Sequence, residues 1–240
     1  MNCNNDSIQR RDFLRLGTAG VLGLSGIASV LGQSQPAHAA DVTSDPILDP
    51  TAALQKLLDG NQRFVQHRPQ YPDQSQVRLQ AVAQAQHPFA TVLSCADSRV
   101  PVELIFDQGI GDIFDVRIAG NISTPEALGS IEYAAVLLGT PVLMVLGHER
   151  CGAVTAAVKG EALPGDIGSF VKAILPAVER VKGQSGDAVE NAVVANVHYQ
   201  IEQLKRSPLL TERLESGQLK IVGGRYDLDT GSVTVVTRSS

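Results

Sequence analysis

The chain has 240 residues, of which 43% are hydrophobic and 19% charged, and its formal net charge at pH 7 is −5. That length and apolar content suit one good-sized domain, or two small ones, with a core that forms without metals or disulfides. The acidic balance argues against nucleic acid as a partner, and three cysteines are too few for a disulfide scaffold.

The first 39 residues have the order of segments that export signals have. The pair Arg10-Arg11 precedes an uncharged run rich in Gly and Ala, residues 16–31, and Ala37-His38-Ala39 then offers the small residues that a signal peptidase reads. The paired arginines favour the twin-arginine route to the periplasm or an equivalent lumenal space. We therefore predict a signal peptide over residues 1–39, a linker over 40–48 and a catalytic domain over 49–240.

Retention of the apolar run as a membrane anchor is the alternative, but the run is short and contains four glycines. We expect no stable membrane span once the signal is removed. Cys95 and Cys151 are then the remaining cysteines of the sequence. In an oxidising compartment two free thiols form a disulfide unless something else, such as a metal ion, holds both.

Helices and strands are predicted to alternate from residue 49 onward. Asp49-Pro50 combines a capping side chain with a proline, which is typical of a helix start, and the leucines that follow repeat at helical spacing. Residues 66–88 are rich in Gln and Pro and are interpreted as an arm or an irregular connection. The next predicted elements are a strand over 89–93, a strand over 113–118, a helix over 124–138 and a strand over 141–146.

The second half of the chain continues the alternation. Its predicted elements are a helix over 152–159, a loop over 160–168, a helix over 168–182 with Pro176 inside it, a helix over 188–206, a shorter helix from Ser207-Pro208, a strand over 219–222 and an antiparallel continuation over 226–236. This pattern predicts an α/β fold, with a mainly parallel central sheet flanked by helices and an antiparallel C-terminal edge strand.

Two short polar segments stand directly after predicted parallel strands, residues 95–99 (Cys-Ala-Asp-Ser-Arg) and residues 148–151 (His-Glu-Arg-Cys). Open α/β sheets bind ligands beyond the carboxyl ends of their strands, so neighbouring strands would bring four metal-type donors together. Thiolate, imidazole and carboxylate are ligands that zinc accepts, and two thiolates select against hard cations such as magnesium. The sequence therefore predicts one Zn²⁺ per chain, with the candidate ligands Cys95, Asp97, His148 and Cys151.

Each segment by itself has an ordinary explanation. A lone Cys at a strand end is usually a small buried hydrophobic residue, and a lone His in a loop is usually solvated or hydrogen-bonded. A structural zinc site is a second alternative, but such sites more often have four Cys or His ligands in close pairs. Arg99 is unusual beside a structural ligand, because it can pair with Asp97 and hold that carboxylate away from the metal.

Three stretches form a specific pattern: residues 94–101 (Ser-Cys-Ala-Asp-Ser-Arg-Val-Pro), 129–134 (Gly-Ser-Ile-Glu-Tyr-Ala) and 147–152 (Gly-His-Glu-Arg-Cys-Gly). In these stretches, and over about residues 50–236, the sequence resembles the β-class carbonic anhydrases. The resemblance implies the zinc ligands Cys95, His148 and Cys151, with Asp97 either ligating or paired with Arg99. It also implies that Asp97 and Arg99 are catalytic.

The activity that the resemblance implies is reversible hydration of carbon dioxide to bicarbonate and a proton. By position, Gln86, Phe114 and Tyr133 match residues that line the substrate pocket in plant-like members, and Gly152 is placed with them. Core packing is the alternative role for the two aromatic residues. Members of the family dimerise with the active-site cleft at the subunit interface, so a homodimer or a larger homo-oligomer is expected.

In the expected mechanism Asp97, held by Arg99, accepts a hydrogen bond from the reacting water, and Gln86 donates to an oxygen of carbon dioxide. One position departs from part of the family, because Val92 replaces a Trp that helps some members to form an inhibitory bicarbonate site. That regulated subtype is not expected here. Two other functions stay open: a non-catalytic zinc-binding assembly module of the same fold, and a hydrolase of carbon disulfide or carbonyl sulfide.

Overall fold

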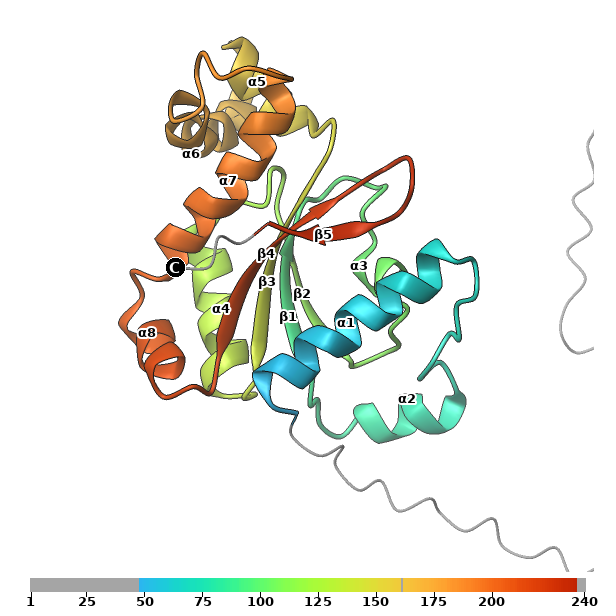
Figure 1. Cartoon of the computed structure of the whole chain (residues 1–240). Helices are drawn as coiled ribbons and strands as arrows, with labels where there is room; N and C mark the ends of the chain where they lie inside the picture. The colour runs from blue at the N-terminus through green and yellow to red at the C-terminus, as the bar shows by residue number, and fades with distance from the viewer. Residues whose placement is uncertain (1–47, 161, 237–240) are drawn as a thin grey trace, which may run out of the picture. The chain divides into compact units, whose positions relative to one another are not determined.

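A five-stranded sheet in the order β2-β1-β3-β4-β5 forms the centre of the fold (Figure 1). This computed structural model describes residues 48–160 and 162–236, all of which belong to one unit of the chain, residues 42–240. The first four strands run parallel, and β5 lies antiparallel to β4. The strands are β1 (Ala90–Ser94), β2 (Ile113–Arg117), β3 (Val142–His148), β4 (Lys220–Tyr226) and β5 (Val233–Val235).

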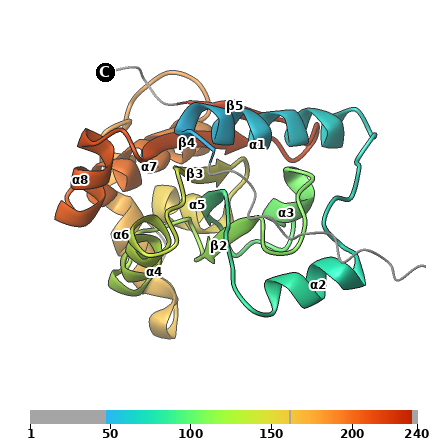
Figure 2. The same cartoon turned by 90° about the horizontal axis from the view of Figure 1, so that it is seen from below.

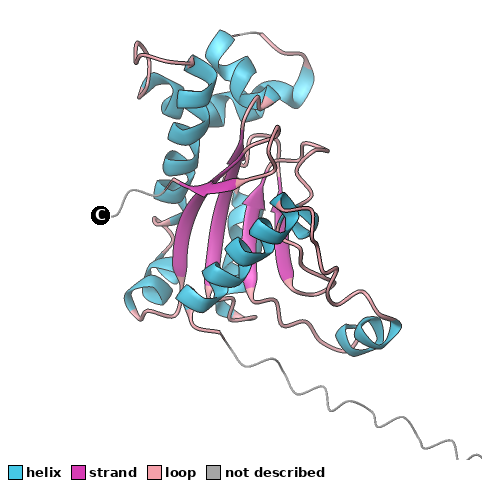
Figure 3. Cartoon of the chain, turned by 45° about the vertical axis from the view of Figure 1, so that its right-hand side comes forward, coloured by secondary structure: helices cyan, strands magenta, loops and turns pink. Residues whose placement is uncertain are grey.

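Helices cover both faces of this sheet (Figure 2, Figure 3). The first face packs against α1 and α3, and the second packs against α4, α7 and α8. Alternate residues of β1 point to opposite faces of the sheet. Val92 packs in the apolar cluster on the first face, and Leu93 packs in the apolar cluster on the second. The helices are α1 (Pro50–Val65), α2 (Gln76–Val82), α3 (Val102–Ile105), α4 (Pro125–Val136), α5 (Gly152–Lys159), α6 (Gly168–Glu179), α7 (Ala188–Leu204) and α8 (Pro208–Glu215), with a 3-10 turn η2 (Gly165–Ile167).

A third apolar cluster lies beyond the C-terminal ends of the central strands. It joins residues of α5, α6 and the first turns of α7, and it includes the side chains of Cys95 and Cys151. Figure 1 shows α5, α6 and the start of α7 grouped past the ends of β1 and β3. The two cysteines are therefore packed into the core at the edge of the sheet where α/β folds place their ligands.

The predicted α/β class, with its parallel strands and antiparallel edge, is confirmed. The predicted helix starts are also confirmed, because α1, α4 and α8 each begin with a proline that follows a capping residue. The capping side chains of Asp49, Thr124 and Ser207 each accept a hydrogen bond from a backbone N–H of the first turn.

Two short helices are missing from the prediction. The interpretation of residues 66–88 as an irregular connection is wrong for residues 76–82, which form α2, and the four-residue α3 has no predicted counterpart. No residue of α2 is buried, and its seven residues are too few for a helical repeat to stand out in the sequence. Arg78 instead holds α2 in place, with Nε donating to the Ile110 carbonyl and Nη2 paired with Asp112 at 2.9 Å.

Among the helices of residues 48–160 and 162–236, none has the length and apolar character that a membrane crossing requires. The predicted signal peptide, and the predicted linker up to residue 47, lie outside the described residues. Both stay predictions.

Candidate metal centre

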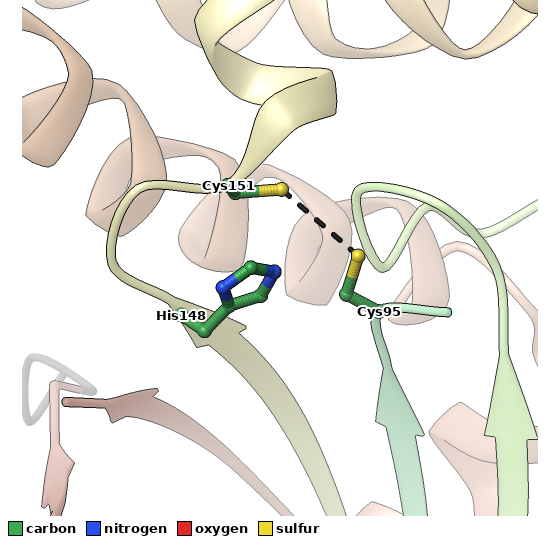
Figure 4. Close-up of side chains that lie close together, drawn as sticks. All are labelled: Cys95, His148 and Cys151. Carbon is green, nitrogen blue, oxygen red and sulfur yellow. Dashed lines mark hydrogen bonds between the residues drawn. The ribbon is translucent and has the colours of Figure 1, made fainter. Parts of the chain in front are cut away.

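Three metal-type side chains meet beyond the C-terminal ends of β1 and β3 (Figure 4). Cys95 follows β1, His148 is the last residue of β3, and Cys151 directly precedes α5. Their donor atoms all lie within 4.8 Å of one another, and the two sulfur atoms are 4.0 Å apart. All three residues are buried. The structure thus brings together three of the four residues that the sequence predicts as zinc ligands.

The pairing of two parallel strands explains why residues so far apart in sequence meet. Ser94 of β1 lies opposite Leu146 of β3 in the parallel register. Cys95 and His148, which follow these positions by one and two residues, therefore reach the same edge of the sheet.

A tight turn then returns the chain from His148 to Cys151. Arg150 has a φ of 51°, in the left-handed region that non-glycine residues adopt only where the surrounding structure imposes it. Just before the turn, Gly147 allows α7 to approach, since a Cβ at that position would lie 2.7 Å from Val197 Cγ2. The metal loop, residues 148–151, is thus fixed both by its own backbone and by the helix packed against it.

The imidazole of His148 is oriented for a metal. Its Nδ1 lies 2.9 Å from the carbonyl oxygen of Glu149, which can only accept, so Nδ1 carries the proton. Its Nε2 is buried and has no hydrogen-bond partner. A buried nitrogen with a free lone pair, facing two sulfur atoms, fits Zn²⁺, for which imidazole and thiolate are common ligands.

Hydrogen bonding between the two thiols separates their pKa values. The bond to Cys151 lowers the pKa of Cys95 to about 4, and the same bond raises the pKa of Cys151. The backbone N–H of Gly120 also donates to the Cys95 sulfur, at 3.3 Å. One thiol of the pair therefore loses its proton more readily than the other, and zinc would displace the remaining proton on binding.

Asp97 is paired with Arg99 and stands outside the three-donor group. Its Oδ1 accepts from the backbone N–H and Nε of Arg99 at 2.9 and 3.0 Å, and its Oδ2 accepts from Nη2 at 2.7 Å. Its Oδ2 lies 3.9 Å from Nε2 of His148. The hydrogen bonds from Arg99 hold the pKa of Asp97 well below its usual range. Of the two arrangements left open by the sequence, the structure shows the pair with Arg99.

Arg117 is a component of the site that sequence reasoning missed. It is the last residue of β2 and lies opposite Ser94. Its guanidinium donates to the carbonyl oxygens of Cys95 and Asp97, so it holds the loop that carries both residues. A polar residue at the end of the strand beside β1 is the one signal that could have indicated it.

The predicted substrate-binding residues are less close together. The rings of Phe114 and Tyr133 lie side by side, with centroids 6.2 Å apart. Phe114 packs with the α4 cluster, while Cys95 belongs to the cluster of α5 to α7. Gln86 is exposed on the connection before β1, and Gly152 begins α5 next to Cys151. The substrate roles of these four residues stay predictions.

Known proteins share this combination of sequence and fold. A family model described as carbonic anhydrase matches residues 90–233. Carbonic anhydrase 2 of Mycobacterium tuberculosis is 42% identical over 191 residues, which cover 78% of this chain and 92% of that protein. A structure of the β-carbonic anhydrase CcaA matches with a TM-score of 0.61 and 31% identity, over 76% of this chain and 94% of the other. A second structure comes from a study of two tetrameric β-carbonic anhydrases of Sordaria macrospora, and it matches with a TM-score of 0.63 over 79% of this chain and 99% of that chain. Its sequence identity is 21%, so this likeness shows the fold alone.

Proposed function

Because this chain belongs to the β-class carbonic anhydrases, we infer that it catalyses the reversible hydration of carbon dioxide to bicarbonate and a proton. The observation that carries this function is the buried Cys-His-Cys donor set beside the Asp97–Arg99 pair. Three protein ligands with a fourth position for water are typical of catalytic zinc sites, whereas structural sites are closed by four protein ligands.

Cys95, His148 and Cys151 would hold one zinc ion per chain. When bound, zinc supplies a Lewis acid that lowers the pKa of water and so provides a nucleophile near neutral pH. The apolar cluster of α5 to α7 packs around the two cysteines and keeps bulk water from the sulfur atoms. The backbone N–H of Gly120 stabilises the Cys95 thiolate.

Arg99 determines what Asp97 does in the reaction. Because Arg99 binds both carboxylate oxygens, Asp97 stays ionised and accepts hydrogen bonds without keeping a proton. Its Oδ2 lies close to Nε2 of His148, beside the position that the metal would take. Asp97 is therefore placed to orient the reacting water.

Stopped-flow measurement of carbon dioxide hydration tests this function directly. Zinc-replete protein is expected to accelerate the reaction, a chelator to abolish the acceleration, and added zinc to restore it. Assays of the same sample with carbon disulfide and carbonyl sulfide separate an anhydrase from a hydrolase built on the same site. A protein that binds one zinc and accelerates none of these reactions would be the non-catalytic assembly module, and the proposed function would be wrong.

The enzyme is proposed to be a homodimer or a larger homo-oligomer. Apolar side chains are exposed on two helices of the single chain: Val77 is 63% exposed and Leu79 47% on α2, and Tyr133 is 44% exposed on α4, with Leu137 at 71% directly after it. A second copy that covers these surfaces would remove them from water. Sedimentation velocity of the zinc-replete enzyme should give at least twice the mass of one chain, and a monomer at micromolar concentration would contradict the proposal.

Export by the twin-arginine route is proposed from the sequence of residues 1–39. The paired arginines, the weakly apolar run and the small residues before position 40 support it. N-terminal sequencing of protein recovered from the periplasm should begin at Ala40, and recovery of the full chain in the cytoplasm alone would contradict it.

A further inference from the structure

Glu149 lies between two zinc ligands in sequence, and its side chain is 10% exposed. Its carboxylate contacts Arg150 Nη1 at 2.9 Å and Arg225 Nη2 at 3.1 Å. Its backbone N–H donates to the Tyr226 carbonyl at 3.0 Å, and its own carbonyl accepts from Nδ1 of His148 at 2.9 Å. The residue therefore connects the ring of a zinc ligand to β4 through both its main chain and its side chain.

Arg225 is the cation at which three parts of the fold meet. Its Nε donates to Glu190 at 2.5 Å, its Nη1 to Asp227 at 2.8 Å and its Nη2 to Glu149 at 3.1 Å. These carboxylates belong to the first turn of α7, to the turn between β4 and β5, and to the metal loop. A guanidinium holds its donors in one plane, so a single side chain fixes the positions of all three.

We propose that Arg225 is a positioning residue for the zinc ligand His148 and that it acts through Glu149. The direction of the His148 ring depends on the Glu149 carbonyl, and that carbonyl is fixed by the left-handed backbone of Arg150 and by the bonds that Glu149 makes to β4. A ring held in this way presents Nε2 in one direction before the metal arrives, so less ordering is needed on binding. The inference rests on the zinc site proposed above.

Removal of Arg225 would leave three carboxylates close together, one of them buried. Arg150 would still contact Glu149, but the buried carboxylate would lose the partner that ties it to β4. A buried charge that loses a partner is strongly destabilised and moves toward water. The Glu149 carbonyl, and with it the ring of His148, would then be held by the backbone contacts alone and less firmly than in the parent.

The test is the rate at which zinc passes from the enzyme to an excess of a chromophoric chelator. Arg225→Met is expected to release zinc about 10- to 100-fold faster than the parent. Arg225→Lys, which keeps the charge without the planar fork, is expected between the two. Arg180→Met is the matched control, because it removes an exposed pair with Glu202, and it should release zinc at the parent rate. The zinc content of the parent is measured first. A parent without zinc would contradict the proposed function, and that failure would be distinct from a failure of the role proposed for Arg225.

Two further readouts separate positioning of the ligand from general stability. The visible absorption of the cobalt-substituted enzyme should change in Arg225→Met and not in Arg180→Met, because it reports the geometry of the ligands. Glu149→Gln should also speed zinc release, and adding Arg225→Met to it should change the rate by less than about threefold, since both act through one series of contacts.

Zinc release at the parent rate in folded Arg225→Met, or an unchanged cobalt spectrum, would overturn the inference. Rates that multiply in the double variant would overturn it as well. If Arg225→Met does not fold, the same measurements on Arg225→Lys and Glu149→Gln decide the question by the same criteria.

Discussion

Asp97→Ala and Arg99→Ala are expected to keep one zinc ion per chain and to lower the rate of carbon dioxide hydration by about 10²- to 10⁴-fold. Zinc stays bound because neither side chain belongs to the three-donor group. The rate falls because the first variant lacks the carboxylate that orients the reacting water, and the second lacks the arginine that holds that carboxylate. Elemental analysis measures the zinc, and stopped-flow mixing measures the rate.

Two conservative variants separate the charge at these positions from the geometry. Asp97→Asn keeps the size of the side chain but replaces one acceptor oxygen with a donor, so it is expected to recover little activity. Arg99→Lys keeps the charge but cannot reproduce the two side-chain bonds of 3.0 and 2.7 Å, so it is expected to recover part of the activity.

The exposed pair of Arg180 and Glu202 provides matched controls, and Arg180→Ala and Glu202→Ala should keep the parent rate within about twofold. Near-normal turnover in both Asp97→Ala and Arg99→Ala would show that the pair takes no part in catalysis. Loss of zinc from Asp97→Ala would show instead that Asp97 is a fourth ligand.

The helices and strands could be predicted from the sequence wherever a capping or turn signal coincides with a buried apolar face. Each of α1, α4 and α8 combines a capping side chain, a proline and a buried face, so the starts of all three helices were predicted to within one residue. In α2 the cap is present, from Ser75, but no buried face follows it. What holds α2 is a pair between Arg78 and the buried Asp112, 34 positions further along the chain, and no local pattern encodes such a contact.

The metal ligands could be predicted from the sequence for the same reason, whereas the residues that hold them in place could not. Cys95 and His148 are chemically distinctive and stand at strand ends, so their meeting follows from a parallel sheet. Arg117 and Arg225 are ordinary arginines in sequence, and their roles depend on which strands become neighbours. Whether Asp97 faces the metal or Arg99 depends on side-chain geometry, and the spacing of residues in the sequence does not determine that geometry.

Cys151→Ser is expected to abolish both zinc binding and carbon dioxide hydration. A serine hydroxyl does not ionise near neutral pH as a thiol can, so the substitution leaves two ligands, Cys95 and His148, where a catalytic zinc site needs three. Cys95→Ser should have the same effect, because both sulfur atoms belong to the same three-donor group.

Elemental analysis should find about one zinc per chain in the parent and almost none in either variant. Added zinc should raise the melting temperature of the parent and leave that of the variants unchanged, since a ligand stabilises only a fold that binds it. Cys3→Ser is the control, because Cys3 lies in the predicted signal peptide, and it should keep the zinc content of the parent. A full zinc content in both Cys95→Ser and Cys151→Ser would place the metal elsewhere. The buried Nε2 of His148 would then need a partner other than zinc. The hydration of carbon dioxide would have to be assigned to another site.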